Sequence, residues 1–540
     1  MDREITGHGG ELALATLRGF GVDELFTLSG GHIFPLYDAA VSSGVRLIDV
    51  RHEQTATFAA EAMAKLTRRP GVVALTAGPG VTNGVSATTT AMFNGSPLIV
   101  IGGRAGNRGW GRGALQEFDH VPVMAPITKW ATTVAETSAI AEVMYTAAEL
   151  ATTAHRGPVF VDIPIDVIYD RATVAAPDRA SPRRADPDPD AVTRAAALIA
   201  GAHQPAIIAG SDVYFDGAWD ALRAAAESLR VPVYLNGLGR GCVPADHDLV
   251  FSSSRSMLKR EADVVVVIGT PLDFRVGFGT FGDAQVVHIV DHADRIATHV
   301  TPAVSVAGDL SAILGALADH RGARRDHEPW IAHLRDAERS LDANDALLLS
   351  AESDPIKPTR IYGELRKTLD RDAVVVCDGG DFVSYAGKYI DSYEPGCWLD
   401  PGPYGCLGTG MGYAMAARIA HPNRQVVVMM GDGAAGFSLL DVDSLVRHNL
   451  PVVIVVGNNG CWALEKFPMT KLYGYHVAAE LRPETRYDLV VGALGGAGET
   501  VTEAGQIAPA LARAFASGVP YLVNVITDAD DEYPRQSALG

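Results

Sequence analysis

The sequence has few cysteines and no apolar run long enough to cross a membrane. Its five cysteines form no Cys-x-x-Cys pair, which argues against a disulfide framework and fits a reducing compartment. No apolar stretch reaches about 18 residues, so no membrane span is expected. The charged start, MDREITGHGGE, lacks the apolar centre of a secretory signal. We therefore expect a cytoplasmic protein.

The sequence also lacks an excess of positive charge. Its formal net charge is −19, which argues against nucleic acid and anionic membranes as partners. With 47% hydrophobic and 20% charged residues, the composition is that of a globular protein. A chain of 540 residues is expected to form about two to four domains.

Short apolar runs rich in Val and Ile alternate with alanine-rich segments along the whole chain. Such runs are typical of strands buried on both faces of a parallel sheet, and their alternation with helices predicts three consecutive doubly wound α/β domains. The expected strands are 25–28, 47–50, 72–76, 98–102 and 159–163, then 206–210, 231–236, 264–269 and 286–290, then 374–377, 426–430, 452–456 and 522–526.

Two polar segments divide these blocks. Residues 173–190 are rich in Pro and charge, and residues 342–358 form a weaker boundary. The predicted domains are therefore 1–172, 191–341 and 358–540.

The most informative motif is Gly431-Asp432-Gly433, followed by Asn458-Asn459. Each motif ends an apolar run, and ligands of parallel sheets bind beyond the carboxyl ends of the strands. One carboxylate and one amide oxygen suit a hard cation such as Mg²⁺. Gly433 allows close approach of a phosphate, and a helix expected to start near Gly436 could direct its N-terminus at that phosphate.

Either motif alone is typical of an ordinary turn. Together, at this spacing, they resemble the diphosphate- and Mg²⁺-binding motif of thiamine diphosphate enzymes. The resemblance implies that Asp432, Asn459 and the Cys461 carbonyl hold Mg²⁺. It also implies cofactor contacts at Gly380, Phe382, Gly431, Gly433 and Ala434.

The family also needs a glutamate that activates the cofactor through N1′ of its aminopyrimidine. Here the expected strand 46–51 is followed by His52-Glu53-Gln54, which opens an alanine-rich helix through Lys65. The alternative is an ordinary first-turn Glu that the helix dipole favours. By its match to the family pattern, Glu53 is our candidate for the activating residue.

Two glycine-rich segments match the family as well. The segment 75–84 resembles the family's GPG-x-x-N turn, which implies that Pro79 and Asn83 face the aminopyrimidine. The segment 405–413 precedes an expected helix at 414–420, and Leu407 is placed to support the bent cofactor. The alternative for Leu407 is a core leucine.

Finer matches indicate the acetolactate synthase branch. Residues 115–118 resemble the Phe-Gln-Glu segment of the synthases, with Leu115 in place of Phe, which implies a substrate role for Gln116. Residues 269–279 resemble a segment in which an Arg meets flavin and the substrate carboxylate. Arg275 matches that Arg, while Pro271 replaces another, so FAD or ADP in the central domain is left open.

The resemblance therefore implies a thiamine diphosphate- and Mg²⁺-dependent enzyme that decarboxylates a 2-keto acid and ligates it to a second one. One alternative is a 2-hydroxyacyl-CoA lyase or oxalyl-CoA decarboxylase, which a basic, CoA-sized groove in the middle domain would favour. Another is a non-catalytic regulatory protein that binds a nucleotide or cofactor. The family also implies a homodimer as the smallest active unit, commonly paired into a homotetramer.

Overall fold

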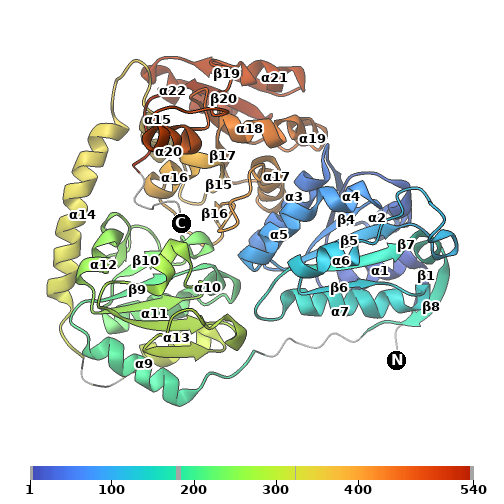
Figure 1. Ribbon diagram of the computed structural model, residues 1–540, viewed down its shortest axis with the longest axis horizontal. Coiled ribbons are helices and arrows are strands. Elements are labelled where there is room, and N and C mark those ends of the chain that lie inside the picture. The colour runs from blue at the N-terminus through green and yellow to red at the C-terminus, as the bar shows by residue number, and fades with distance from the viewer. Residues whose placement is uncertain (1–3, 178–183, 321, 323, 535–540) are drawn as a thin grey trace.

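The computed structural model describes residues 4–177, 184–320, 322 and 324–534, and it contains three six-stranded parallel sheets flanked by helices (Figure 1). The N-terminal domain lies beside both other domains. The long helix α14 runs from the middle domain to the C-terminal one. The three-domain α/β fold expected from the sequence is confirmed.

The N-terminal sheet has the strand order β3-β2-β4-β5-β7-β6. Its strands are β2 (Glu24–Thr27), β3 (Arg46–Asp49), β4 (Gly71–Leu75), β5 (Leu98–Arg104), β6 (Trp130–Thr133) and β7 (Val159–Pro164). Its helices are α1 (Gly9–Arg18), α2 (Phe34–Ser43), α3 (Glu53–Thr67), α4 (Pro79–Asn83), α5 (Val85–Asn94), α6 (Val121–Met124), α7 (Ile140–Thr152) and α8 (Ile165–Ile168). An antiparallel ribbon joins β1 (Glu4–His8) to β8 (Arg171–Ala175).

The middle sheet has the order β11-β10-β9-β12-β13-β14. Its strands are β9 (Pro205–Ala209), β10 (Val233–Leu235), β11 (Val250–Phe251), β12 (Val264–Ile268), β13 (Gln285–Val290) and β14 (Val304–Ala307). Its helices are α9 (Pro189–Gly201), α10 (Ser211–Phe215), α11 (Trp219–Leu229), α12 (Leu258–Glu261), α13 (Leu310–Ala318) and α14 (Glu328–Leu349). All five residues of β12 are buried, as a strand covered on both faces requires.

The C-terminal sheet has the order β16-β15-β17-β18-β20-β19. Its strands are β15 (Val374–Asp378), β16 (Trp398–Leu399), β17 (Val426–Gly431), β18 (Val453–Asn458), β19 (Ala497–Val501) and β20 (Tyr521–Ile526). Its helices are α15 (Pro358–Thr368), α16 (Gly380–Tyr389), α17 (Gly410–Ala420), α18 (Asp432–Ser438), α19 (Val442–Arg447), α20 (Ala463–Tyr473), α21 (Tyr487–Ala493) and α22 (Ile507–Ala516).

One prediction about these helices is wrong. The helix after the Gly-Asp-Gly motif begins at Asp432 and not near Gly436. The earlier start places Asp432 in the first turn of α18, directly at the end of β17.

The expected boundary segments are only partly linkers. Of residues 173–190, residues 178–183 lie outside the described part of the chain, and α9 already begins at Pro189. The segment 342–358 begins inside α14. Within the described ranges, none of the helices has the length and apolar character that crossing a membrane requires.

A buried polar network joins the first and third domains where α3 packs on α17. Tyr413 donates a hydrogen bond to Glu61 (2.7 Å), and Lys65 pairs with Glu61 at 2.9 Å and donates to Tyr413 at 2.8 Å. All three side chains are almost completely buried, so removing one partner would leave a costly unpaired group. This network fixes the helix that begins at Glu53.

Candidate active site

The carboxyl ends of β17 and β18 form one half of the site. The two strands pair in parallel, with Gly431 opposite Gly457, as expected for neighbouring strand ends. A pocket at this edge is lined by Asp432 and Asn459 together with Gly379, Gly380, Phe382, Gly431, Gly433, Ala434, Cys461 and Trp462. The structure thus brings together the predicted cofactor residues of the C-terminal domain, apart from Leu407, which borders the pocket.

Asp432 is a buried carboxylate held by backbone donors. Its oxygens accept hydrogen bonds from Gly433 N (3.0 Å) and Gly460 N (2.8 Å). Burial nevertheless raises the pKa of Asp432 to about 6, because desolvation outweighs these bonds. A divalent cation beside the carboxylate would favour its charged form and so oppose this shift.

The two asparagines at the end of β18, Asn458 in the strand and Asn459 just after it, make different contacts. Asn458 points into the protein, where its amide nitrogen donates to Thr485 O (3.0 Å) and to Asn524 Oδ1 (3.1 Å). Asn459 lines the pocket, and its Oδ1 accepts from Cys461 N at 3.3 Å. Asn458 therefore holds the loop, while Asn459 offers an oxygen to a ligand.

The donors in this pocket fit Mg²⁺ rather than a thiol-seeking metal. Burial raises the pKa of the Cys461 thiol to about 12, so the thiol stays protonated and is a poor metal ligand. The Asn459 amide and the Asp432 carboxylate offer hard oxygen donors in this pocket, and the Cys461 carbonyl stays a predicted third donor.

Two glycines at this edge allow aromatic rings to pack against the backbone, and a third leaves the start of α16 open. A Cβ on Gly433 would lie 2.4 Å from the Trp462 ring, and a Cβ on Gly457 would lie 1.7 Å from the Phe382 ring. Gly380 opens α16, and a Cβ there would meet only open space. Exposed backbone at a helix N-terminus favours an anion, so the pocket fits a diphosphate.

Leu407 borders this pocket from the next loop. Its side chain lies about as close to Gly379 as van der Waals contact allows, since a Cβ on Gly379 would be 3.1 Å from it. The carboxylate of Asp378 accepts from Gly408 N (3.0 Å) and Gly410 N (2.8 Å) and so fixes the turn that carries Leu407. Its predicted support of the cofactor stays a prediction.

The second half of the site lies on the N-terminal domain. Glu53 is buried at the start of α3, and its Oε2 accepts a hydrogen bond from Asn83 Nδ2 at 3.0 Å. Asn83 ends α4, which begins at Pro79 immediately after the glycine turn. The two segments that the sequence assigned to the aminopyrimidine are therefore in direct contact.

Gln116 lies beside the same turn. Its backbone is left-handed (φ 58°), and a Cβ on Gly78 would lie 3.1 Å from the Gln116 Cβ. The neighbouring Leu115 is 78% exposed, which leaves an apolar side chain free to line a substrate space.

Sequence reasoning missed two histidines at this edge. His32 follows β2, where its Nδ1 lies 3.4 Å from Thr76 Oγ1, and His120 contacts Gly78 N at 2.9 Å. The position of His32, after an apolar run and two glycines, could have marked it as a candidate site residue in the sequence. His120 offered none, because its partners are distant in the sequence.

The described residues of the N-terminal domain do not line the pocket around Asp432, although Gln54, next to Glu53, donates a hydrogen bond to Leu407 O at 3.2 Å. Every residue that lines the Asp432 pocket comes from the C-terminal domain, whereas Glu53, Asn83 and Gln116 belong to the N-terminal one. Arg275 lies in neither half-site. Its guanidinium pairs with Asp273 at 2.7 Å, and its predicted contact with a substrate carboxylate stays a prediction.

Family models match each of the three domains. They describe a thiamine pyrophosphate enzyme, with the N-terminal TPP binding domain at residues 7–123, the central domain at 192–317 and the C-terminal TPP binding domain at 378–525. Thiamine pyrophosphate is another name for thiamine diphosphate. The chain belongs to this family of enzymes, as the two half-sites indicate.

Within the family, the chain lies in the acetolactate synthase-like branch. It is 50% identical over 539 residues to the acetolactate synthase large subunit IlvG of Mycobacterium tuberculosis, covering 99% of this chain and 98% of the relative. It is also 34% identical to the 2-hydroxyacyl-CoA lyase 2 of Caenorhabditis elegans (93% and 86% covered) and 32% identical to that of Homo sapiens (98% and 92%).

Proposed function

We propose that this enzyme decarboxylates pyruvate and ligates the two-carbon product to a second 2-keto acid, with thiamine diphosphate and Mg²⁺ as cofactors. The observation that carries the proposal is the pair of half-sites around Glu53 and Asp432 in a chain half identical to an acetolactate synthase over its full length.

Each candidate site residue has a separate role in the proposed reaction. When bound, thiamine diphosphate supplies a carbon nucleophile and an electron sink for decarboxylation. Glu53, held by Asn83 in a dry environment, holds and moves the proton at N1′ of the aminopyrimidine. Asp432, Asn459 and the Cys461 carbonyl would hold Mg²⁺, and the metal would help to retain the diphosphate. Gln116 orients the donor or acceptor acid.

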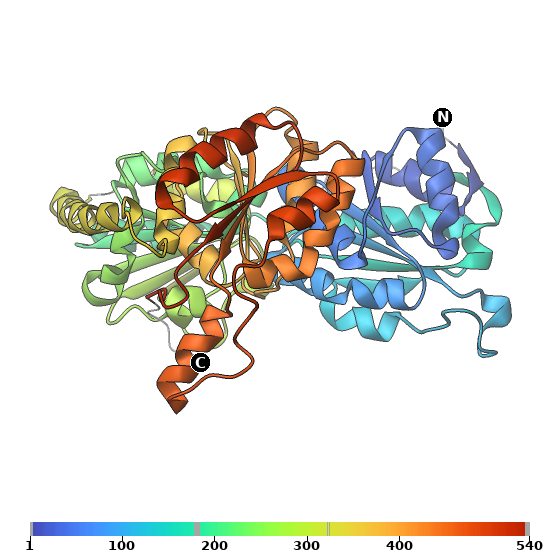
Figure 2. The same cartoon turned by 90° about the horizontal axis from the view of Figure 1, so that it is seen from above.

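A second copy of the chain supplies the missing half of each site. Apolar side chains stand exposed on both domains that carry half-sites, among them Leu115, Phe437 and Leu440. Helix α20 and the loop after it project from the body of the molecule (Figure 2) and expose Leu472 and Tyr473. Such surfaces favour burial against a partner, which supports a homodimer; the pairing of dimers into a tetramer rests on the family resemblance alone.

The residues around Arg275 are closely packed in this structure. The space that Arg275 borders with Lys65 and Trp398 measures about 10 Å³, which is roughly one water molecule. We therefore assign no step to FAD.

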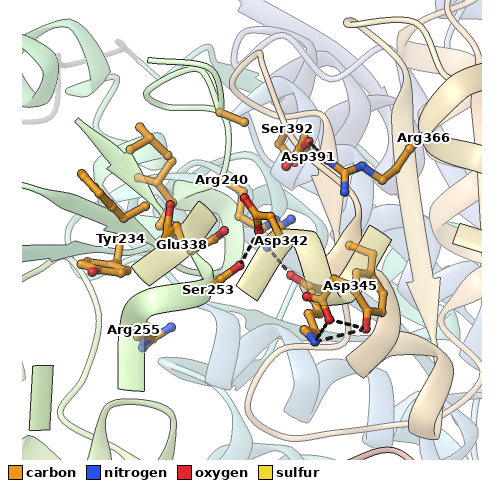
Figure 3. A pocket seen from close by; sticks show the side chains of 18 of the residues that line it. Tyr234, Arg240, Ser253, Arg255, Glu338, Asp342, Asp345, Arg366, Asp391 and Ser392 are labelled. Carbon is orange, nitrogen blue, oxygen red and sulfur yellow. Dashed lines mark hydrogen bonds and ion pairs between the residues drawn. The ribbon is translucent and has the colours of Figure 1, made fainter. Parts of the chain in front are cut away.

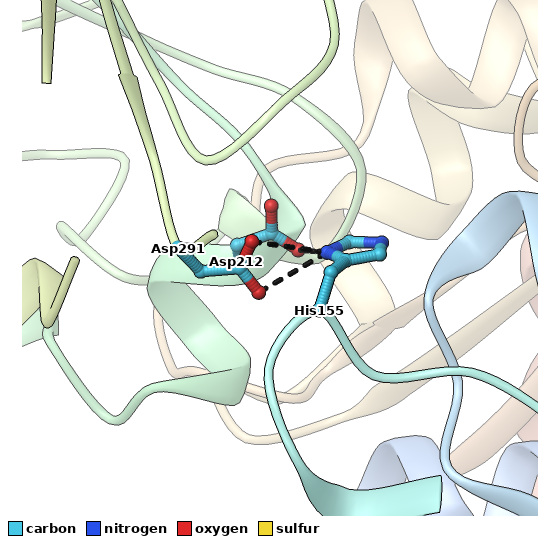
Figure 4. Close-up of side chains that lie close together, drawn as sticks. All are labelled: His155, Asp212 and Asp291. Atoms are coloured by element: carbon cyan, nitrogen blue, oxygen red, sulfur yellow. Dashed lines mark hydrogen bonds and ion pairs between the residues drawn. The ribbon is translucent and has the colours of Figure 1, made fainter. Parts of the chain in front are cut away.

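An inter-domain contact also occupies the edge of the middle sheet where a nucleotide would bind. His155 reaches across from the N-terminal domain to Asp212 and Asp291, which follow β9 and β13 (Figure 4). Its Nδ1 lies 3.1 Å from both oxygens of Asp291 and 3.6 Å from Asp212. A bound FAD or ADP would have to displace this ion pair.

The lyases among the relatives support a second candidate, the cleavage of a 2-hydroxyacyl-CoA. A cavity of about 650 Å³ beside α14 is the place to look for a CoA groove (Figure 3). Its charges are mixed and largely paired, for example Lys388 with Asp345 at 2.8 Å and Arg366 with Asp391 at 3.1 Å. A phosphate-rich ligand such as CoA is bound by cations that are free of other partners. Because the cations of this cavity are largely paired with carboxylates, the cavity argues against a CoA site, and this supports the synthase over the lyase.

The test is a mass-spectrometric screen of products from pyruvate, 2-ketobutyrate, oxalyl-CoA and a 2-hydroxyacyl-CoA. We expect acetolactate from pyruvate, dependent on both thiamine diphosphate and Mg²⁺. Cleavage of the CoA ester without acetolactate would replace the synthase with the lyase.

A further inference from the structure

Buried, hydrogen-bonded side chains connect strands β5 and β7 of the N-terminal sheet to the loop that carries Gln116. His120 and Asp162 are both fully buried, and His120 Nδ1 lies 3.0 Å from Asp162 Oδ1. The other oxygen of Asp162 accepts from Arg104 at 3.0 Å. Arg104 ends β5 and Asp162 lies in β7, so the rigid sheet orients the imidazole.

The hydrogen bonds fix the tautomer of His120. A backbone N–H can only donate, so the 2.9 Å contact from Gly78 N requires an unprotonated Nε2. The ring proton is therefore on Nδ1 and is donated to Asp162. His120 acts as a neutral connector that accepts at one end and donates at the other.

Gly78 is the residue where this connection reaches the candidate active site. It is left-handed (φ 63°), it is the N-cap of α4, and its backbone packs against Gln116. Helix α4 ends at Asn83, which holds Glu53. The hydrogen bond that Gly78 N donates to His120 therefore steadies both the Gln116 contact and the turn that leads to Asn83.

The remainder of the Gln116 loop is attached to the same arginine. The Arg104 guanidinium lies 3.6 Å above the Trp110 ring and 3.2 Å from Asp119. Arg112 lies between these two anchors and Arg108 lies just before the first, and both side chains are exposed. The loop is thus fixed at its ends and accessible in its middle.

We propose that Asp162 and His120 are positioning residues for the reaction, and that they set the place of Gln116 and of the Gly78 turn relative to the substrate. The proposal deepens the proposed function and rests on it for the substrate. It requires a side chain at position 120 that accepts from Gly78 and donates to Asp162 at the same time. A glutamine amide can do both, whereas leucine can do neither.

The test compares His120→Leu with His120→Gln in the full-length enzyme. We expect His120→Leu to lower kcat/KM for pyruvate by about 10- to 100-fold, since small displacements of positioned groups have effects of this size. The thiamine diphosphate Kd should stay within about twofold, because the diphosphate half lies on the other domain. His120→Gln should recover kcat/KM to within about fivefold of wild type.

Trypsin cleavage after Arg108 and Arg112 gives a readout that needs no substrate. His120→Leu should be cleaved faster in this loop than wild type, and His120→Gln should not. His327→Leu is the matched control, because His327 is equally buried but contacts only backbone carbonyls of the middle domain. It should leave both the loop cleavage and kcat/KM unchanged.

If His120→Leu fails to fold, His120→Asn replaces it, since asparagine is too short to reach both partners. Wild-type kinetics and cleavage in the Leu or Asn variant would overturn the proposal. So would a folded His120→Gln that is as impaired as His120→Leu. If wild type turns over no 2-keto acid, the proposed function fails, while the cleavage comparison still decides whether His120 orders the loop.

Discussion

Glu53→Gln is expected to lower turnover of pyruvate by about 10²-fold or more, the size of effect of a lost acid–base group. The variant keeps the size of the side chain and its contact with Asn83 Nδ2 through the amide oxygen. It removes the carboxyl that, in the proposed function, exchanges a proton with N1′ of the aminopyrimidine. Thiamine diphosphate should still bind, because the Asp432 pocket is untouched. Steady-state kinetics and cofactor titration measure the two effects separately.

Glu142→Gln is the matched control for this variant. Glu142 is also a first-turn acid, at the start of α7, but it is exposed and lies outside both half-sites. If Glu53 served only the helix dipole, both substitutions would cost about 0.3–1 kcal/mol of stability and leave turnover alone. Near-normal turnover in Glu53→Gln would remove the basis for its role in activation.

Asp432→Ala is expected to abolish Mg²⁺-dependent retention of thiamine diphosphate. It removes the charged member of the oxygen donor set formed with Asn459 and the Cys461 carbonyl. Titration of the cofactor-free protein with and without Mg²⁺ measures the loss. Unchanged affinity would mean that the Gly431–Gly433 turn is structural.

The pH dependence of wild type checks the same carboxylate. Because burial raises the pKa of Asp432 to about 6, the metal must displace a proton at lower pH. Retention should therefore weaken below about pH 6 by up to about tenfold per pH unit. In cofactor-free protein, the free energy of unfolding should fall as pH rises from about 4 to about 6, because the Asp432 carboxyl ionises more readily in the unfolded chain than in its buried site. Asp432→Asn has no carboxyl at this position and should not show this loss. A stable but non-binding Asp432→Asn would show that lost binding is not misfolding.

The sequence predicts the centres of the three sheets better than their edges. All expected strands form, because central parallel strands are buried on both faces and read as continuous runs of Val and Ile. The missed strands of the large sheets are edge strands: β6, β11, β14, β16 and β19. In β14, for example, buried and half-exposed residues alternate, and β11 and β16 have two residues each.

In the site, too, some residues could be predicted from the sequence and others could not. Asp432, Asn459 and Glu53 could be found because each directly follows a buried strand or opens a helix. The His120–Asp162 pair could not, since 42 positions separate the two residues and only the packing of the start of α6 against β7 brings them together. The start of α18 was misplaced because Gly433 and Gly436 read as loop residues. Gly433 is instead required inside the helix by the Trp462 ring.

In the proposed dimer, each cofactor is held by the Asp432 half of one chain and activated by Glu53 of the other. Co-expression of Glu53→Gln and Asp432→Ala chains with different tags tests this arrangement directly, with CO₂ release from pyruvate as the readout. Each variant alone should be inactive. Purified mixed dimers should regain about half of the wild-type activity, because one of their two sites has both intact residues. A mixed dimer no more active than its parents would contradict the account and place both residues in one chain's site.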